Sequence, residues 1–233
     1  MIKAIIFDFW GTLVENGIFP SPVKQVKYIL RVPMSFRDFI VRFEHSIMTK
    51  PYSDMNEAFI AVCDEFKIQP NEAMIERLVG MWNKNELLAK PFLETIEVLE
   101  RLKKEGIKIG LISDSTPTIT RVVEKFELGK HFDQMVFSFD TGLLKTDPEM
   151  YHQLIKKLGV KPEEVVVVGD SIPTDIIGAR NAGLKTILLD RRNKREFSPK
   201  IVNLREIVTH MENKTFEELA SIEPNLEERK EED

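Results

Sequence analysis

Short apolar runs of strand type recur along this chain of 233 residues, and from residue 91 onward they alternate with amphipathic helical segments. The runs occupy residues 4–8, 108–113, 134–139, 164–170 and 184–190. Apolar runs bounded in this way are typical of parallel strands that are covered on both faces. The alternation therefore predicts an α/β fold with a doubly wound parallel sheet.

Residues 23–90 follow a different pattern, because their apolar side chains repeat at three- and four-residue spacing with no convincing strand between them. We expect a helical cap domain over residues 17–90, inserted into a core domain made of residues 1–16 and 91–233. Side chains that can cap the N-termini of the expected helices are those of Ser35, Asp54 or Ser53, and Asn71.

Residues suited to phosphate chemistry lie at the ends of the predicted strands. Asp8, Ser113 and Asp170 each end an apolar run, and Asp175 follows five residues after Asp170. Lys145 lies just before a helix that begins with a proline. Ligands of doubly wound sheets bind at the carboxyl ends of the strands. Three carboxylates gathered there repel each other unless a cation lies among them, and a divalent metal such as Mg²⁺ suits such ligands.

These segments, taken together, resemble the motifs of the haloacid dehalogenase-like (HAD) hydrolase superfamily over residues 4 to 190. The first motif of that superfamily, D-x-D-G-T-[LV], corresponds here to Asp8-Phe9-Trp10-Gly11-Thr12-Leu13. The resemblance implies a Rossmann-like core with a helical cap inserted after the first motif. It also implies a Mg²⁺-dependent phosphatase that acts on a small phosphorylated molecule.

The resemblance further implies catalytic roles for Asp8, Ser113 and Lys145. Asp8 would attack phosphorus and form an aspartyl-phosphate, Ser113 would donate a hydrogen bond to a phosphoryl oxygen, and Lys145 would neutralise charge. The expected metal ligands are the carboxylates of Asp8, Asp170 and Asp175 and the backbone carbonyl of Trp10.

Trp10, Thr12 and Asp114 are expected on the substrate side of the site. Thr12 and the glycine before it can turn backbone N–H groups toward an anion. Asp114 either caps the helix that follows it or helps to hold the cap domain.

Trp10 departs from the superfamily pattern, in which a second aspartate protonates the leaving oxygen and then activates water. An indole can do neither, and general acid–base help contributes roughly 10²–10⁴-fold to a rate. We therefore expect slow turnover of alkyl phosphates and a smaller loss with activated aryl phosphates. The sequence offers four substitutes and does not rank them: Glu15, Asp38, Glu44 and His45.

Two other functions stay open. Superfamily 2-haloacid dehalogenases also carry an aromatic residue at the Trp10 position, and Ser113, Lys145 and Tyr151 fit them. A carboxylate-binding arginine would come from Arg31, Arg37 or Arg42. The carboxylate of Asp170 argues against this reading, because without a metal it would repel a haloacid. The second alternative is a non-catalytic protein that binds a phosphorylated metabolite.

The composition limits the kinds of molecule that this protein is expected to bind. A net charge of −5 argues against nucleic acid, and no apolar run approaches the ~18 residues that cross a bilayer. Cys63 is the only cysteine, so we expect no intrachain disulfide and a cytoplasmic protein. We expect a small-molecule substrate and a monomer or homodimer. The glutamate-rich segment from about Glu217 to the end is expected to be a solvated or disordered tail.

Overall fold

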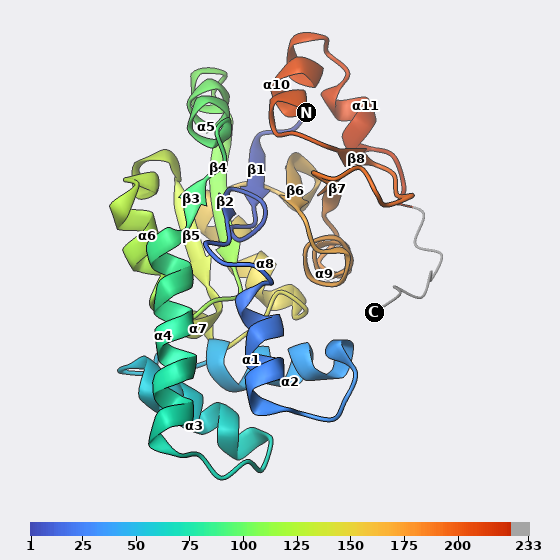
Figure 1. Ribbon diagram of the computed structural model, residues 1–233. Coiled ribbons are helices and arrows are strands. Elements are labelled where there is room, and N and C mark those ends of the chain that lie inside the picture. Colours follow the sequence, from blue (N-terminus) through green and yellow to red (C-terminus); the bar gives the residue numbers. More distant parts are fainter. Residues whose placement is uncertain (225–233) are drawn as a thin grey trace.

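A computed structural model describes residues 1–224 of the protein and contains a six-stranded sheet with the order β5-β4-β1-β6-β7-β8. Every neighbouring pair in this sheet is parallel. The predicted doubly wound α/β fold is therefore confirmed, with β1 at the centre of the sheet (Figure 1). The strands are β1 (Ala4–Phe7), β4 (Lys108–Ser113), β5 (Gln134–Phe137), β6 (Val165–Gly169), β7 (Lys185–Leu189) and β8 (Lys200–Ile201).

Helices cover both faces of the sheet, and the alternation of side chains along β1 shows how. Ile5 and Phe7 are buried against α5, α6, α10 and α11, whereas Ala4 and Ile6 are buried against α8 and α9. A strand that is buried on both faces has a continuous apolar sequence, and the apolar run at residues 4–8 correctly predicted such a strand. These helices are α5 (Thr95–Lys104), α6 (Ile119–Lys125), α8 (Pro148–Leu158), α9 (Gly178–Asn181), α10 (Arg205–Glu212) and α11 (Phe216–Ala220).

Four further helices form a group with its own buried apolar cluster, separate from the clusters of the sheet. Figure 1 shows them together beyond one end of the sheet, opposite the end that carries α10 and α11. Ser35, Asp54 and Asn71 cap α2, α3 and α4 through their side chains, as predicted, and Ser53 is not the cap. The helices are α1 (Pro22–Leu30), α2 (Phe36–Met48), α3 (Met55–Glu65) and α4 (Glu72–Leu88).

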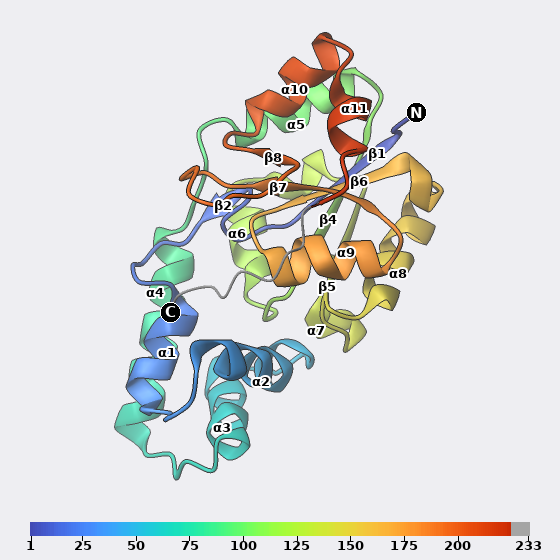
Figure 2. The same ribbon diagram turned by 90° about the vertical axis from the view of Figure 1, so that its right-hand side faces the viewer.

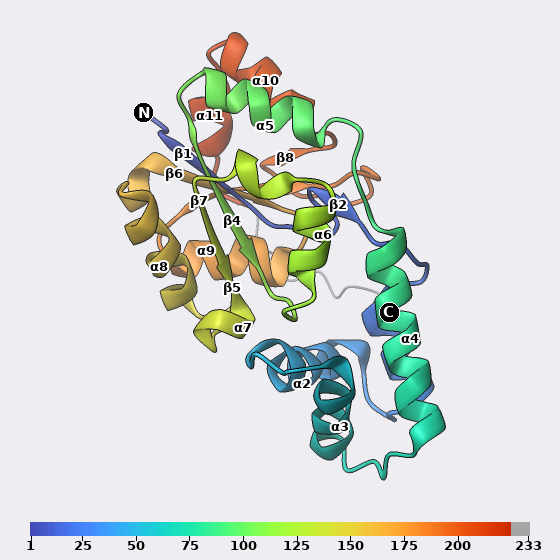
Figure 3. The same ribbon diagram turned by 90° about the vertical axis from the view of Figure 1, so that its left-hand side faces the viewer.

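Two short antiparallel strands, β2 (Val14–Glu15) and β3 (Lys90–Pro91), connect the helical group to the sheet. The hydroxyl of Thr95 donates to the carbonyl of Leu13 over 2.7 Å and fixes the start of α5 beside this connection. The remaining short elements are η1 (Leu128–His131), α7 (Ser138–Thr141), η2 (Pro162–Glu164) and the π-helical turn η3 (Ile172–Ile177). The figures turned by 90° show α2 next to α7 from both sides (Figures 2 and 3).

The expectation of a solvated tail from Glu217 onward was wrong for its first residues. Phe216 and Ala220 of α11 are buried in the core, and the carboxylate of Glu217 accepts the backbone N–H of Ile2 at 2.7 Å. This segment is helical because it covers the edge of the sheet, despite its charge. The rest of the expected tail, residues 225–233, lies outside the described residues. No helix within residues 1–224 is long and apolar enough to cross a membrane.

Candidate active site

Lys145 joins two carboxylates at the carboxyl ends of neighbouring strands. Its Nζ donates to Oδ1 of Asp8 at 2.8 Å and to Oδ1 of Asp175 at 2.6 Å. All three side chains are almost fully buried. Asp8 directly follows β1, Asp175 lies in η3 after β6, and Lys145 lies between α7 and α8. The sheet therefore brings together residues that are up to 167 positions apart in the printed sequence, from Asp8 to Asp175.

Asp170 completes a cluster of three carboxylates with Asp8 and Asp175. One oxygen from each of these side chains lies within 4.8 Å of the others. The carboxylate of Asp170 lies against Gly11, whose φ is +83°, and a Cβ at Gly11 would overlap it. A Cβ at Gly169 would likewise overlap the carboxyl group of Asp175. Both glycines are thus required by the close approach of backbone and carboxylate.

The π-helical turn η3 holds Asp175 in place. Oδ2 of Asp175 accepts the backbone N–H of Ser171 at 2.9 Å, so that both of its oxygens have partners. The Ser171 hydroxyl in turn accepts the N–H of Thr174 and caps the turn. Turns of this kind are rare in proteins, and those that do occur are often found at functional sites.

The cluster has more negative than positive charge. Two unit charges 4.8 Å apart repel by about 3–4 kcal/mol at an effective dielectric constant of 20. Burial raises the pKa of Asp8 to about 6, although Lys145 opposes the shift. Burial and the carboxylates of Asp8 and Asp175 raise the pKa of Asp170 to about 8. Burial lowers the pKa of Lys145, but Asp175 and Asp8 outweigh it and keep that pKa well above its ordinary value.

The three carboxylates fit a divalent cation. Oδ2 of Asp8 is buried and has no hydrogen-bond partner among the described residues. Such an oxygen costs free energy unless a ligand pairs with it. Carboxylate oxygens are the ligands that Mg²⁺ prefers, and the repulsion within the cluster favours a cation there.

Ser113, Thr12 and Asp114 lie around the same strand ends. Ser113 is the last residue of β4 and is buried, and its hydroxyl makes only a long hydrogen bond, 3.4 Å, to the carbonyl of Asp114. The hydroxyl of Thr12 is buried beside Asp8. Oδ1 of Asp114 accepts the backbone N–H of Lys145 at 2.9 Å, whereas its Oδ2 has no partner among residues 1–224. Asp114 therefore does not cap a helix as one alternative had it, since α6 begins at Ile119 after Thr118.

Comparison with known proteins decides the family. The sequence model of the haloacid dehalogenase-like hydrolases matches residues 2–183. This chain belongs to the haloacid dehalogenase-like hydrolase family.

The members most useful for comparison differ in activity. The chain is 38% identical over 192 residues to a glyceraldehyde 3-phosphate phosphatase of Pyrococcus furiosus, with 80% of each chain covered. A HAD phosphatase from Thermococcus onnurineus matches the fold with a TM-score of 0.61 at 22% identity, covering 90% of this chain and 98% of that one. A 2-haloacid dehalogenase from Pseudomonas syringae matches it with a TM-score of 0.62 at 21% identity, covering 91% and 99%. The fold is thus common to both activities.

Trp10 lies outside the carboxylate cluster in this HAD hydrolase. Its ring meets Phe9 edge-on, with centroids 5.1 Å apart, and packs against the core of the sheet. The side chain two positions after Asp8 is an indole, which carries no acidic group.

The sequence did not indicate a role for Arg191, which holds the backbone of the first motif in place. Arg191 follows β7, and its guanidinium donates to the carbonyls of Gly11 at 3.2 Å and Thr12 at 2.7 Å. The same group donates to Glu94 at 2.6 Å and stacks on the ring of Phe92 at 3.5 Å. An arginine 180 residues away from the motif carries no local signal, so this role becomes visible only in three dimensions.

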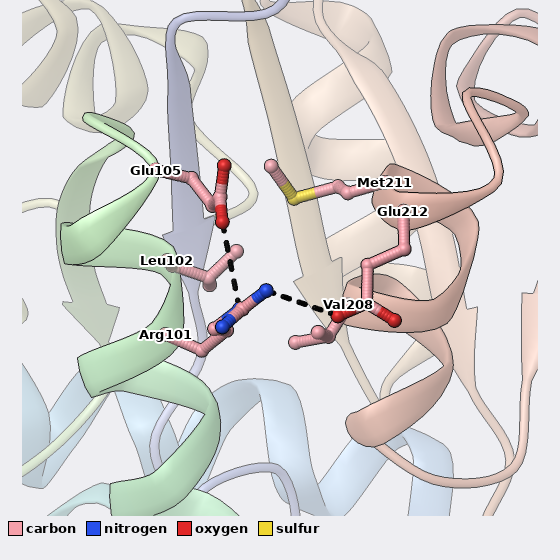
Figure 4. A pocket seen from close by; sticks show the side chains of 6 residues that line it. All are labelled: Arg101, Leu102, Glu105, Val208, Met211 and Glu212. Atoms are coloured by element: carbon pink, nitrogen blue, oxygen red, sulfur yellow. Dashed lines mark hydrogen bonds and ion pairs between the residues drawn. The ribbon is translucent and has the colours of Figure 1, made fainter.

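A small pocket of about 90 Å³ lies far from these residues, between α5 and α10. Figure 4 shows Arg101 between Glu105 and Glu212, with which it forms ion pairs. The charged residues of this pocket are ion-paired, and it contains none of the predicted site residues.

Proposed function

We propose that this protein is a Mg²⁺-dependent phosphatase that acts on a small phosphorylated molecule through an aspartyl-phosphate on Asp8. The observation that carries the proposal is the buried cluster of three carboxylates with Lys145 bridging two of them. A phosphorylated metabolite is an anion, and an excess of negative charge repels it. A site that only bound such a ligand would therefore not need three carboxylates.

Each residue has a role that follows from its place. Asp8 attacks phosphorus, and Lys145, held by Asp175, keeps the Asp8 carboxylate oriented and neutralises charge on the phosphoryl group. The hydroxyls of Ser113 and Thr12, together with the backbone N–H groups around Thr12, bind phosphoryl oxygens. The Ser113 hydroxyl makes a long hydrogen bond, and the Thr12 hydroxyl has no partner among the described residues. Asp8, Asp170, Asp175 and the carbonyl of Trp10 would hold Mg²⁺. Bound Mg²⁺ neutralises phosphoryl charge and allows an anionic nucleophile to approach.

Residues 17–90 act as a cap domain on the core formed by residues 1–16 and 91–233. Helix α4 contacts the core through Trp82, whose indole N–H donates to Thr116 at 3.4 Å, and through Glu86, whose carboxylate accepts from Thr118. Residues 14–15 and 90–91 form the two connections, and their pairing makes them a suitable hinge. A cap over the strand ends restricts the substrate to small molecules and excludes water during chemistry.

Within residues 1–224, none of the three arginines that the sequence offered for binding a haloacid carboxylate makes a hydrogen bond or ion pair with the carboxylate cluster. Arg42 is committed to α3, because it donates to the carboxylate and carbonyl of Glu65 and stacks over Phe66. Arg31 and Arg37 are exposed. The carboxylate of Asp170 beside Asp8 would repel a haloacid, which favours the phosphatase.

The test is hydrolysis of p-nitrophenyl phosphate with Mg²⁺, with EDTA, and with Asp8→Asn, alongside halide release from L-2-chloropropionate. D-Glyceraldehyde 3-phosphate is the first natural candidate, since relatives of this chain carry that activity in their names. The proposal predicts phosphate release that requires both Mg²⁺ and Asp8. Halide release in EDTA would refute it in favour of the dehalogenase, and no reaction with either substrate would favour the binding protein.

A further inference from the structure

The residues assigned so far to the proposed phosphatase include no proton donor for the leaving group. Asp8 is the nucleophile, Asp170 and Asp175 are metal ligands, and the indole of Trp10 faces Phe9. Asp114 has one oxygen occupied by the backbone N–H of Lys145 and the other without a partner within residues 1–224, so it is the competing candidate that Asp114→Asn tests. An acid from outside the sheet would complete the site.

Helix α2 brings the cap to the strand ends. The carbonyl of Thr49, at the end of α2, lies 3.8 Å from the position of a Cβ at Gly142, which ends α7. Leu144, next to Lys145, packs against the buried cluster of the cap that contains Met48. Figures 2 and 3 show α2 beside α7 from opposite sides. One face of α2 therefore lies over the segment that carries Lys145.

Glu44 lies on that face. It precedes Met48 by four residues, and side chains with this spacing are neighbours on a helix. Glu44 is half-buried, yet within residues 1–224 its carboxylate has no hydrogen bond or ion pair. A carboxylate that is partly shielded from water and has no protein partner is available to contact a bound substrate.

The other three substitutes that the sequence offered are exposed to solvent. His45, next to Glu44 on α2, is exposed. Asp38 is exposed and accepts the hydroxyl of the capping residue Ser35 at 2.8 Å. Glu15 is exposed on β2.

We infer that Glu44 of the cap is the acid and base of this phosphatase, in place of the aspartate that Trp10 replaces. The inference rests on the proposed function, and it assigns to Glu44 direct contact with the leaving oxygen of the substrate.

The surroundings of Glu44 keep its carboxyl protonated near neutral pH. Burial and the carboxylate of Asp114 raise the pKa of Glu44 to about 8, with Lys145 opposing the shift and Asp175 and Asp8 adding to it. A general acid is most effective when its pKa lies near the working pH.

The proposed reaction has two steps, transfer of the phosphoryl group to Asp8 and hydrolysis of the aspartyl-phosphate. An oxygen of Asp8 bonds to phosphorus, the bond from phosphorus to the leaving oxygen breaks, and the Glu44 carboxyl gives its proton to that oxygen. Glu44, now a carboxylate, takes a proton from water. The water oxygen bonds to phosphorus, the bond from phosphorus to Asp8 breaks, and inorganic phosphate leaves with Asp8 and Glu44 restored.

Glu44→Gln tests the inference with two substrates of different leaving groups. Glycerol phosphate has a poor leaving group and needs the proton, whereas p-nitrophenyl phosphate does not. We expect kcat/KM for glycerol phosphate to fall about 10²–10⁴-fold, and kcat/KM for p-nitrophenyl phosphate, which reports the first step, to fall less than about tenfold. Glu44→Asp should recover part of the loss. His45→Gln, on the neighbouring exposed residue, is the matched control and should change neither.

The pH profile and a second variant separate Glu44 from its neighbours. In the wild type, kcat/KM for glycerol phosphate should fall as pH rises through the pKa of Glu44, and this limb should be absent in Glu44→Gln. The inference is overturned if Glu44→Gln loses activity equally on both substrates. It is also overturned if Asp114→Asn, but not Glu44→Gln, selectively loses activity on glycerol phosphate. Either result leaves the proposed phosphatase function intact. A wild type without Mg²⁺-dependent phosphate release would overturn the proposed function and the inference with it.

Discussion

Asp170→Asn provides a direct test of the repulsion in the carboxylate cluster. In EDTA, Lys145 is the buried counter-charge that the three carboxylates have within the described part of the chain, and the pKa of Asp170 is raised to about 8. A group whose folded pKa exceeds its unfolded value stabilises the protein at low pH, and this contribution is lost as pH rises through the folded pKa. The wild type without metal should therefore lose stability between about pH 4 and pH 8. Asp170→Asn should lose less, because the amide keeps the shape and removes the charge.

The size of the effect follows from the geometry. Oxygens within 4.8 Å repel by about 3–4 kcal/mol for each ionised pair at an effective dielectric constant of 20. A gain of about 3 kcal/mol at pH 8 corresponds to a rise of roughly 6–12 °C in the melting temperature for a chain of this size. Mg²⁺ should raise the melting temperature of the wild type and have little effect on the variant, because a metal ligand is lost.

Thermal unfolding followed by circular dichroism, in EDTA and in Mg²⁺ at several pH values, measures both quantities. Asp140→Asn, on an exposed aspartate of α7, is the matched control and should leave both unchanged. The reasoning fails if Asp170→Asn melts below the wild type in EDTA at pH 8, or if Mg²⁺ stabilises it as much as the wild type.

Three further changes test other parts of the site. Gly11→Ala should abolish Mg²⁺-dependent activity, because a Cβ would displace Asp170 and a φ of +83° costs an L-residue about 1–2 kcal/mol; normal activity with p-nitrophenyl phosphate would contradict this. Arg191→Ala should lower the free energy of unfolding by about 3–5 kcal/mol, because Glu94 stays buried without its partner. Arg205→Ala breaks only the exposed pair with Glu97 and should cost far less, so equal losses of the two variants in denaturant titrations would contradict a structural role for Arg191. Lys145→Met should abolish turnover, because Asp8 and Asp175 lose their shared cation, and unchanged kcat would remove Lys145 from the mechanism.

The sequence predicted the parts of this protein that depend on periodicity and on strand ends. The apolar runs gave the parallel sheet, and the rule that ligands bind at carboxyl ends correctly brought Asp8, Asp170 and Asp175 together. Strands of two residues, such as β2, β3 and β8, have no measurable period and were not foreseen. Helix α11 was missed because its charge suggested solvent, whereas its stability comes from the burial of Phe216 and Ala220.

The candidate site was predicted less completely than the fold. The sequence named Glu44 among four substitutes, but the choice depends on which face of α2 meets the core, and this is a tertiary property. Arg191 could not be predicted at all, because its partners lie 179 and 180 residues away. The sequence left two roles open for Asp114, and the structure excludes the helix cap because the following helix begins at Ile119.

The measurement that tests the central claim most directly is detection of the phosphorylated enzyme. The protein is mixed with p-nitrophenyl phosphate and Mg²⁺, quenched in acid within the first turnover and digested, and the peptide that contains Asp8 is analysed by mass spectrometry. We predict a phosphoryl group on Asp8 that hydroxylamine removes, and none in Asp8→Asn or in EDTA. Phosphate release by the wild type with no phosphoryl group on that peptide at any quench time would contradict Asp8 as the nucleophile.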